Sequence, residues 1–184
     1  MFDLVRKYRL LRHRYGHGVH SPFAYRLVRD VVYGRGIYYT VKVFRRLTDG
    51  FPKGLKREYQ LLFRLVARLG PAEARIADSI EPQMDLLVRL ADGRTVMAHG
   101  LGGYHRQGNV LSICEAADLY GGRVPEGILS DGNILWIREL QMAPEVLEAA
   151  IGAMPGGWVL YDKRHALLIA NKENPLNKIP VKLT

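Results

Sequence analysis

The sequence predicts an α/β protein: a Rossmann-like, mostly parallel sheet with helices on both faces, a C-terminal antiparallel hairpin and an N-terminal helical extension. Helical spacing dominates as far as residue 70, and strand-like and helix-like segments alternate after it. Strands that alternate with helices usually lie parallel in one sheet. We therefore expect a basic helical extension over residues 1–70 and a reduced α/β domain over residues 71–184, packed as one compact unit.

Four segments of the extension have the spacing of amphipathic helices. Asp3 to Arg14 carries apolar residues at every third or fourth position, with arginines between them. Ser21 and Pro22 are typical of an N-cap followed by a first helical turn, where the missing N–H of proline costs nothing. Two further helices are expected over Tyr39 to Leu47 and Leu55 to Leu69.

The second part of the chain alternates short apolar runs with helical segments. Strands are expected over residues 75–80, 94–99, 133–137, 157–161 and 165–170. Helices are expected over residues 82–91, 109–119 and 143–153. Because the turn Asp162-Lys163-Arg164 is tight, the last two strands are interpreted as an antiparallel hairpin at the edge of the sheet.

The composition is that of a folded protein. Hydrophobic residues make up 48% of the 184 residues and charged residues 24%, which excludes a disordered chain. No apolar run approaches the roughly 20 residues of a membrane-spanning helix, and the basic N-terminus lacks the pattern of a secretory signal. Cys114 is the only cysteine, which excludes an internal disulfide and a cysteine-based zinc site. A cytoplasmic setting is expected.

Positive charge is concentrated in the first third of the chain. Residues 1–60 contain 14 Lys and Arg against 4 Asp and Glu, whereas the rest of the chain contains 13 against 14. Such a segment can bind nucleic acid or an acidic partner, or it can be a solvated surface that serves only solubility. The candidate binding residues are Arg6, Arg9, Arg12, Arg14, Lys42, Arg45 and Arg46.

Three stretches resemble a bacterial family of class I S-adenosylmethionine-dependent methyltransferase-like proteins. Arg14 to Tyr25 resembles the family's N-terminal signature, in which a basic helix leads into GHGVHSPF. Gly103 to Arg106 is similar to the family's DGNHR turn, with Gly102 where an aspartate is usual. Residues 133–184 look like the family's last three strands. The resemblance covers roughly two-thirds of the chain and is weak in the middle.

The resemblance implies S-adenosylmethionine as the cofactor and a site at the carboxyl ends of the strands. The positions that match cofactor contacts are Asp78, Ser79, Gly100, Gly102, Gly103 and His105. A further hypothesis is a homo-oligomer or a pairing with a full-length relative, in which the shortened sheet supplies an edge or an apolar helix face.

Several departures from the family pattern predict weak or absent catalysis. The family places an acidic-x-Gly-x-Gly loop after the first strand, where the backbone must turn sharply and approach the cofactor. Asp78 matches the acidic residue, but Ile80 and Pro82 stand where glycines are expected. The family's paired aspartates align with Arg138 and Glu139, and a cation there would repel a sulfonium.

The middle of the chain also departs from the family. The acidic residue that holds the ribose hydroxyls after the second strand has no clear counterpart. The strand over residues 94–99 is interpreted as similar to the family's fourth strand. The second and third strands are therefore expected to be missing.

Other polar groups allow two interpretations each. His17 and His20 have a spacing that can ligate a metal, although glycines around them favour structural histidines in a loop. The glycine-rich turn Gly100 to Tyr104 is either a vestigial anion pocket with His105 and Arg106 or a surface turn.

The carboxylates Asp78, Glu81 and Asp85 lie near the end of the first strand. A general base is one interpretation. Capping of the helix that begins at Pro82 explains Glu81 more simply.

Overall fold

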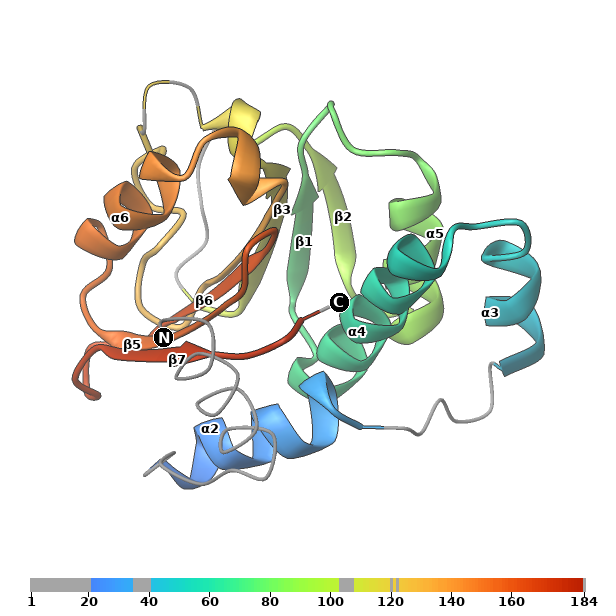
Figure 1. Ribbon diagram of the computed structural model, residues 1–184, viewed down its shortest axis with the longest axis horizontal. Coiled ribbons are helices and arrows are strands. Elements are labelled where there is room, and N and C mark those ends of the chain that lie inside the picture. Colours follow the sequence, from blue (N-terminus) through green and yellow to red (C-terminus); the bar gives the residue numbers. More distant parts are fainter. Residues whose placement is uncertain (1–20, 35–40, 103–107, 120, 122, 184) are drawn as a thin grey trace, which may run out of the picture.

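The computed structural model describes residues 21–34, 41–102, 108–119, 121 and 123–183 (Figure 1). Seven strands of this part of the chain form one sheet in the order β2-β1-β3-β4-β6-β5-β7. They are β1 (Glu73–Ile76), β2 (Val96–His99), β3 (Val110–Glu115), β4 (Ile134–Arg138), β5 (Gly157–Tyr161), β6 (Ala166–Ala170) and β7 (Asn177–Pro180).

The sheet is mostly parallel. Four adjacent strands pair in parallel with one another, in the order β2, β1, β3 and β4. β6 is antiparallel to both β4 and β5, and β7 is parallel to β5. The predicted Rossmann-like α/β fold with a C-terminal antiparallel strand pair is therefore confirmed. The predicted hairpin strands at residues 157–161 and 165–170 correspond to β5 and β6.

Helices cover both faces of this sheet. They are α2 (Pro22–Arg26), which continues as the π-helix η1 (Leu27–Val32), α3 (Val41–Leu47), α4 (Lys53–Leu69), α5 (Gln83–Ala91) and α6 (Glu145–Gly152). Two short 3-10 helices follow β3 and β4, η2 (Ala116–Asp118) and η4 (Leu140–Met142). In Figure 1, α3, α4 and α5 lie to one side of β1 and β2, and α6 lies to the other side.

The helix boundaries follow from local chemistry. The Ser21 hydroxyl accepts a hydrogen bond from the backbone N–H of Ala24 at 3.3 Å, and Pro22 occupies the first turn, as predicted. At the other end of the extension, Gly70 ends α4 in the left-handed conformation, with φ of 54°. Glycine adopts this conformation without the steric cost that other residues have.

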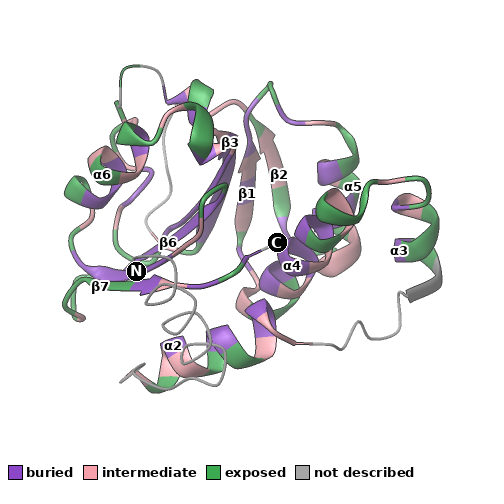
Figure 2. Ribbon diagram, in the orientation of Figure 1, coloured by how far each residue is buried: buried purple, intermediate pink, exposed green. Residues whose placement is uncertain are grey.

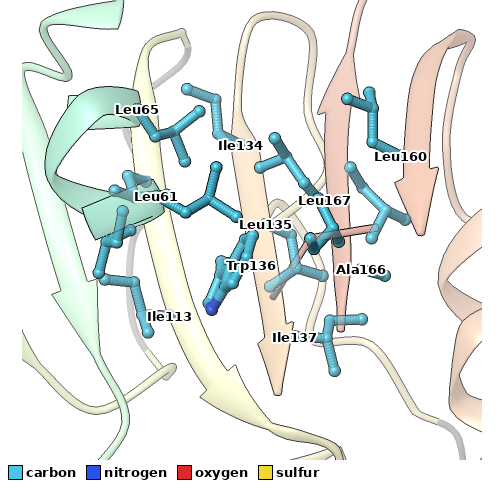
Figure 3. Packing of buried hydrophobic residues seen from close by; sticks show 14 of the residues in the cluster. Leu61, Leu65, Ile113, Ile134, Leu135, Trp136, Ile137, Leu160, Ala166 and Leu167 are labelled. Atoms are coloured by element: carbon cyan, nitrogen blue, oxygen red, sulfur yellow. The ribbon is translucent and has the colours of Figure 1, made fainter. Parts of the chain in front are cut away.

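The hydrophobic core is continuous across residue 70. Buried side chains of α2, η1 and α4 belong to the same cluster as those of the strands. Figure 3 shows Leu61 and Leu65 of α4 facing β3 and β4, near Ile113 and Leu135. Figure 2 shows the central strands almost wholly buried, in contrast to the exposed outer turns of α3 and α6. Every residue of β4 and β6 is buried, because both faces of the sheet are covered.

The predicted helix over residues 109–119 is wrong. Residues 110–115 form β3, which lies between β1 and β4, and η2 follows it. The run Val110-Leu111-Ser112-Ile113-Cys114 is apolar apart from one buried serine. A strand buried on both faces has a near-continuous apolar run and lacks the alternation that distinguishes a strand from a buried helix.

Two other expectations about the sheet are wrong. Val96–His99, which was interpreted as similar to the family's fourth strand, pairs with β1 at the outer edge of the sheet, and β1 and β3 separate it from β4. A strand therefore does follow the first helix of the α/β part, next to β1. The hairpin is not at the edge of the sheet either. β7, which was not predicted, pairs with β5 and forms that edge.

The entry to β5 depends on the absence of a side chain at Gly157. Its φ is 110°, and a Cβ atom there would lie 2.1 Å from the backbone oxygen of Ile169. We expect Gly157→Ala to lower the free energy of unfolding by about 1–3 kcal/mol, because the neighbouring backbone must move. The matched control is Gly152→Ala at the end of α6, where nothing lies within 4 Å. It should be neutral or stabilising, as measured by urea denaturation, and equal losses in both variants would contradict the argument.

Candidate functional site

The loops that follow β1 and β2 meet at the carboxyl edge of the sheet, where α/β folds usually bind ligands. Ile76 and His99, the last residues of these strands, are paired in register. The backbone N–H of Gly100 donates to the oxygen of Ile76 at 2.9 Å. The structure therefore brings Asp78 and Ser79 to the same edge as Gly100 and Gly102.

These candidate cofactor residues have few polar contacts with one another. Asp78 and Ser79 are exposed. The Ser79 hydroxyl donates to Oδ2 of Asp118 at 2.6 Å, and the backbone oxygen of Gly102 accepts a hydrogen bond from Arg75 at 2.9 Å. Gly103 and His105 lie outside the described residues. The segment that follows Gly103–Arg106 is β3, not a helix as expected.

The loop after β1 directs an aliphatic side chain into the protein. The N–H of Ile80 donates to the oxygen of Ala77 at 3.0 Å, which closes a tight turn. Ile80 is 6% exposed and belongs to the hydrophobic core. Among the described residues with a side chain, positive φ values occur at Asn109 and Glu139 only. The loop thus follows a path that isoleucine tolerates and does not need the glycines of a cofactor loop.

A buried arginine lies at the centre of the same edge. Arg138, the last residue of β4, is 6% exposed. Its Nη1 and Nη2 atoms donate to the two carboxylate oxygens of Glu81 at 2.6 and 3.2 Å. Its Nε atom is 2.5 Å from Oε1 of Glu58, a residue of α4 that is 5% exposed. Arg138 is therefore paired with one carboxylate from the β1 loop and one from the helical extension.

Glu81 does not cap α5 as expected, since no side chain caps that helix. It accepts a hydrogen bond from the Tyr59 hydroxyl at 3.0 Å in addition to the bonds from Arg138. Burial raises the pKa of Glu81, but the hydrogen bonds from Arg138 outweigh it, so the pKa lies below its ordinary value. Burial and the negative charge of Glu81 raise the pKa of Tyr59, which remains a neutral donor.

A histidine at the start of β6 extends this charge cluster. His165 is 2% exposed and stacks on Trp136, with ring centroids 5.5 Å apart. Its Nε2 atom is 3.5 Å from Glu58 and its Nδ1 atom is 3.6 Å from Asp162. Burial lowers the pKa of His165, but the interactions with Asp162 and Glu58 outweigh it and raise the pKa to about 9. At pH 7 this charge cluster therefore contains two cations, Arg138 and His165, beside the carboxyl groups of Glu58, Glu81 and Asp162.

Asp162 connects the cluster to the C-terminal segment. Its Oδ1 atom accepts backbone hydrogen bonds from Arg164 and His165 at 2.7 and 2.9 Å. Its Oδ2 atom accepts one from Leu183 at 2.9 Å. Next to Leu183, the N–H of Lys182 donates to the Tyr33 hydroxyl at 3.1 Å. The cluster thus connects the helical extension with the β1 loop, the end of β4, the β5–β6 turn and the last described residues. Its polar groups contact other groups of the protein.

Two further acidic residues at this edge are Glu115, the last residue of β3, and Asp118 in η2. Asp118 accepts hydrogen bonds from Ser79 and from the N–H of Glu115. Burial raises the pKa of Glu115 above its ordinary value, although the positive charge of the nearby Arg138 acts in the opposite direction. Within the described part of the chain, no group of three or more His, Cys, Asp or Glu side chains is arranged to bind a metal ion. His17 and His20 lie outside that part.

A groove of about 770 Å³ lies at the opposite, amino edge of the sheet. It is lined by residues that precede β3, β4 and β5, among them Gly108, Ser130 and Pro155, and by Lys172 after β6. Its position does not coincide with any of the candidate cofactor residues.

The candidate partner-binding residues are only partly described. Arg45 and Arg46 are exposed on α3. Lys42 lies in α3, but its side chain is outside the description, as are Arg6, Arg9, Arg12 and Arg14. Among the described helices, none has the length and apolar character to span a membrane.

Sequence reasoning missed Glu58, Asp162 and His165 as members of the cluster. A signal for Glu58 was present: it lies between Leu55 and Leu62 on the apolar stripe of α4, at helical spacing. A charged residue on such a stripe indicates a buried partner. No comparable signal marks His165, because its partners come from distant segments.

No family model matches this chain, and no curated protein or solved structure matches it either. The functional argument therefore depends on the site itself.

The protonation of His165 predicts how stability changes with pH. Its pKa in the folded protein, about 9, exceeds the ordinary value of 6.5. Its contribution to folding is thus fully present below about pH 6.5 and is lost as the pH rises through about 9. We expect the unfolding free energy of the unmodified protein to fall more steeply between pH 7 and 10 than that of His165→Gln. Chemical denaturation at several pH values measures both slopes, and parallel curves would refute the assignment.

The pairing of Arg138 predicts a large effect of its removal. Arg138→Met leaves Glu58 and Glu81 buried without their cation, so we expect a loss of about 3–5 kcal/mol in unfolding free energy. The control is Arg94→Met, which removes a 3.1 Å ion pair with Asp92 from an arginine whose side chain is 91% exposed. That change should cost less than about 1 kcal/mol. Urea denaturation distinguishes the two, and a small loss for Arg138→Met would contradict a structural role for the cluster.

Proposed function

We propose that the chain is a methyltransferase-like protein of the Rossmann type that no longer transfers methyl groups from S-adenosylmethionine. One observation carries the proposal. At the sheet edge where such a cofactor would bind, Ile80 is packed into the core and Glu81 is bonded to Arg138 and Tyr59. Side chains of the protein therefore occupy the region where the resemblance implies bare glycine backbone against a nucleoside.

The end of β2 gives independent support. The resemblance implies a carboxylate after the second strand, which accepts hydrogen bonds from the ribose hydroxyls. β2 lies beside β1 but ends in His99 and Gly100. An imidazole has at most one acceptor nitrogen, so it cannot accept both hydroxyls as a carboxylate does.

The charge of Arg138 does not itself argue against a cationic cofactor. Glu58 and Glu81 both pair with Arg138, so its charge is compensated within the protein. The repulsion expected for a sulfonium is thereby reduced. The proposal depends on steric occupation of the edge and on the missing ribose carboxylate.

The proposed role is that of a scaffold. In place of a cofactor, the charge cluster connects α4, the β1 loop and the β5–β6 turn. A residual contact with S-adenosylmethionine would involve Asp78, Ser79 and the turn that begins at Gly100. Of the described residues there, Asp78, Ser79 and Gly102 are exposed.

Isothermal calorimetry and thermal unfolding with S-adenosylmethionine test this proposal. We expect no saturable heat and no rise in Tm at millimolar ligand, since a ligand that binds only the folded state must raise its stability. The control is Asp78→Asn, which removes the one match to the cofactor loop and should behave identically. Saturable binding that Asp78→Asn abolishes would overturn the proposal.

A further inference from the structure

The side of α4 opposite the sheet carries exposed basic residues near both ends of the helix. The structure describes every residue of this helix, and its only acidic residue, Glu58, is buried against Arg138. The basic residues of α4 lie on the side opposite the core, at spacings of three, four and seven residues. They are Lys53, Lys56, Arg57, Arg64 and Arg68. From Lys53 to Arg68 the row is about 22 Å long, at 1.5 Å per residue.

α3 carries two further exposed arginines beside α4. It packs against α4 through Phe44 and Phe63, whose ring centroids are 5.9 Å apart. Arg45 and Arg46 follow Phe44 and are exposed. We define the basic face as Arg45, Arg46, Lys53, Lys56, Arg57 and Arg68. None of these six side chains forms an ion pair with a described residue.

Two other arginines on this side are excluded from the basic face. Arg64 donates to the backbone oxygens of Val31 and Val32 at 2.7 and 3.4 Å, so it is committed to the end of η1. Arg29 pairs with Asp30 at 2.5 Å, which cancels its charge.

The chemistry of the basic face favours nucleic acid over other polyanions. On the outward side of α4, the residues between the cations are Gly54, Gln60 and Ala67. A membrane surface or an acidic protein requires larger apolar or aromatic groups to insert or to form an interface core. Among the described residues of α3 and α4, Val43 is the single large apolar side chain that is strongly exposed, at 48%. Four of the six cations are arginines, whose planar guanidinium groups match phosphate oxygens in pairs.

The same face favours a duplex over a single strand. Single strands are bound by exposed aromatic rings on which bases stack. The aromatic residues of the described helices on this side are buried or half-buried. They are Phe23 and Tyr25 of α2, Phe44 of α3, and Tyr59 and Phe63 of α4; Phe51, in the loop before α4, is half-buried as well. Among the described residues, the cations therefore have no exposed ring beside them. They can contact backbone phosphates but cannot stack on unpaired bases.

From these contacts we infer that the basic face of α3 and α4 binds the phosphate backbone of double-stranded nucleic acid without reading its sequence. This inference goes beyond the proposed loss of methyl transfer and does not depend on it. The ordered ion pairs of the charge cluster fix α4 from its inner side, so that its outer cations form a rigid row.

A labelled mixed-sequence duplex of about 25 base pairs tests the inference by fluorescence polarisation with the full chain, from ~50 to ~200 mM salt. We expect affinity to fall steeply with salt, with a logarithmic slope of about −0.9 for each phosphate contacted. The variant Lys53→Gln/Arg57→Gln/Arg68→Gln should bind at least about tenfold more weakly. Its salt slope should be less steep by about two to three.

The matched control is Arg94→Gln/Arg164→Gln/Lys172→Gln, which removes the same charges from exposed positions on loops of the sheet. It should bind as the unmodified chain does, and circular dichroism should show both variants folded. Three results would each overturn the inference. They are equal weakening of binding in both variants, unchanged binding by the α4 variant, and no duplex binding by the unmodified chain at ~50 mM salt. Tighter binding to single strands, or to vesicles of anionic lipid in place of the duplex, would overturn it as well.

Discussion

The pairing of Arg138 with two carboxylates is the interaction on which the arrangement of this protein depends. A guanidinium that leaves water loses several kcal/mol of hydration free energy, so Arg138 can be buried only where Glu58 and Glu81 reach it. Glu58 comes from the helical extension and Glu81 from the loop after β1. Since the two acceptors come from separate segments, both can reach Arg138 only when α4 lies in one position on the sheet. His165 and Asp162 extend the same constraint to the β5–β6 turn.

This cluster uses the position at which Rossmann-like folds bind ligands. The carboxyl ends of β1 and β4 usually border an open crevice, and polar groups there normally face a ligand. Here they face one another, and the neighbouring Ile80 belongs to the hydrophobic core. A side chain that satisfies another side chain is not available to a substrate. The firm attachment of the helical extension follows from these contacts, and so does the proposed loss of cofactor chemistry.

α4 carries a buried negative charge on its inner side and exposed positive charges on its outer side, because its helical period places these residues on opposite sides. Its inner stripe places Glu58 among leucines, and its outer stripe places Lys53, Arg57 and Arg68 in solvent. The inner charge is strongly paired because it is buried, whereas the outer charges are screened by water and counterions. The inner side of the helix thus contributes to stability and the outer side is available for a polyanionic partner.

The sequence by itself determined the fold class, most of the helices and the hairpin strands. The signals for these elements are local, because the hydrophobic period, the N-cap Ser21 and the helix-ending Gly70 each depend on residues that are close together in the chain. It also marked Ile80 and Arg138 as departures from the pattern of the family that it resembles. Only the tertiary structure decided that residues 110–115 form a central strand, that β7 closes the edge and that Arg138 is neutralised by Glu58. The physical reason is that burial on both faces removes the alternation that distinguishes a strand. Ion-pair partners that are separated by tens of residues, in turn, leave no periodic signal.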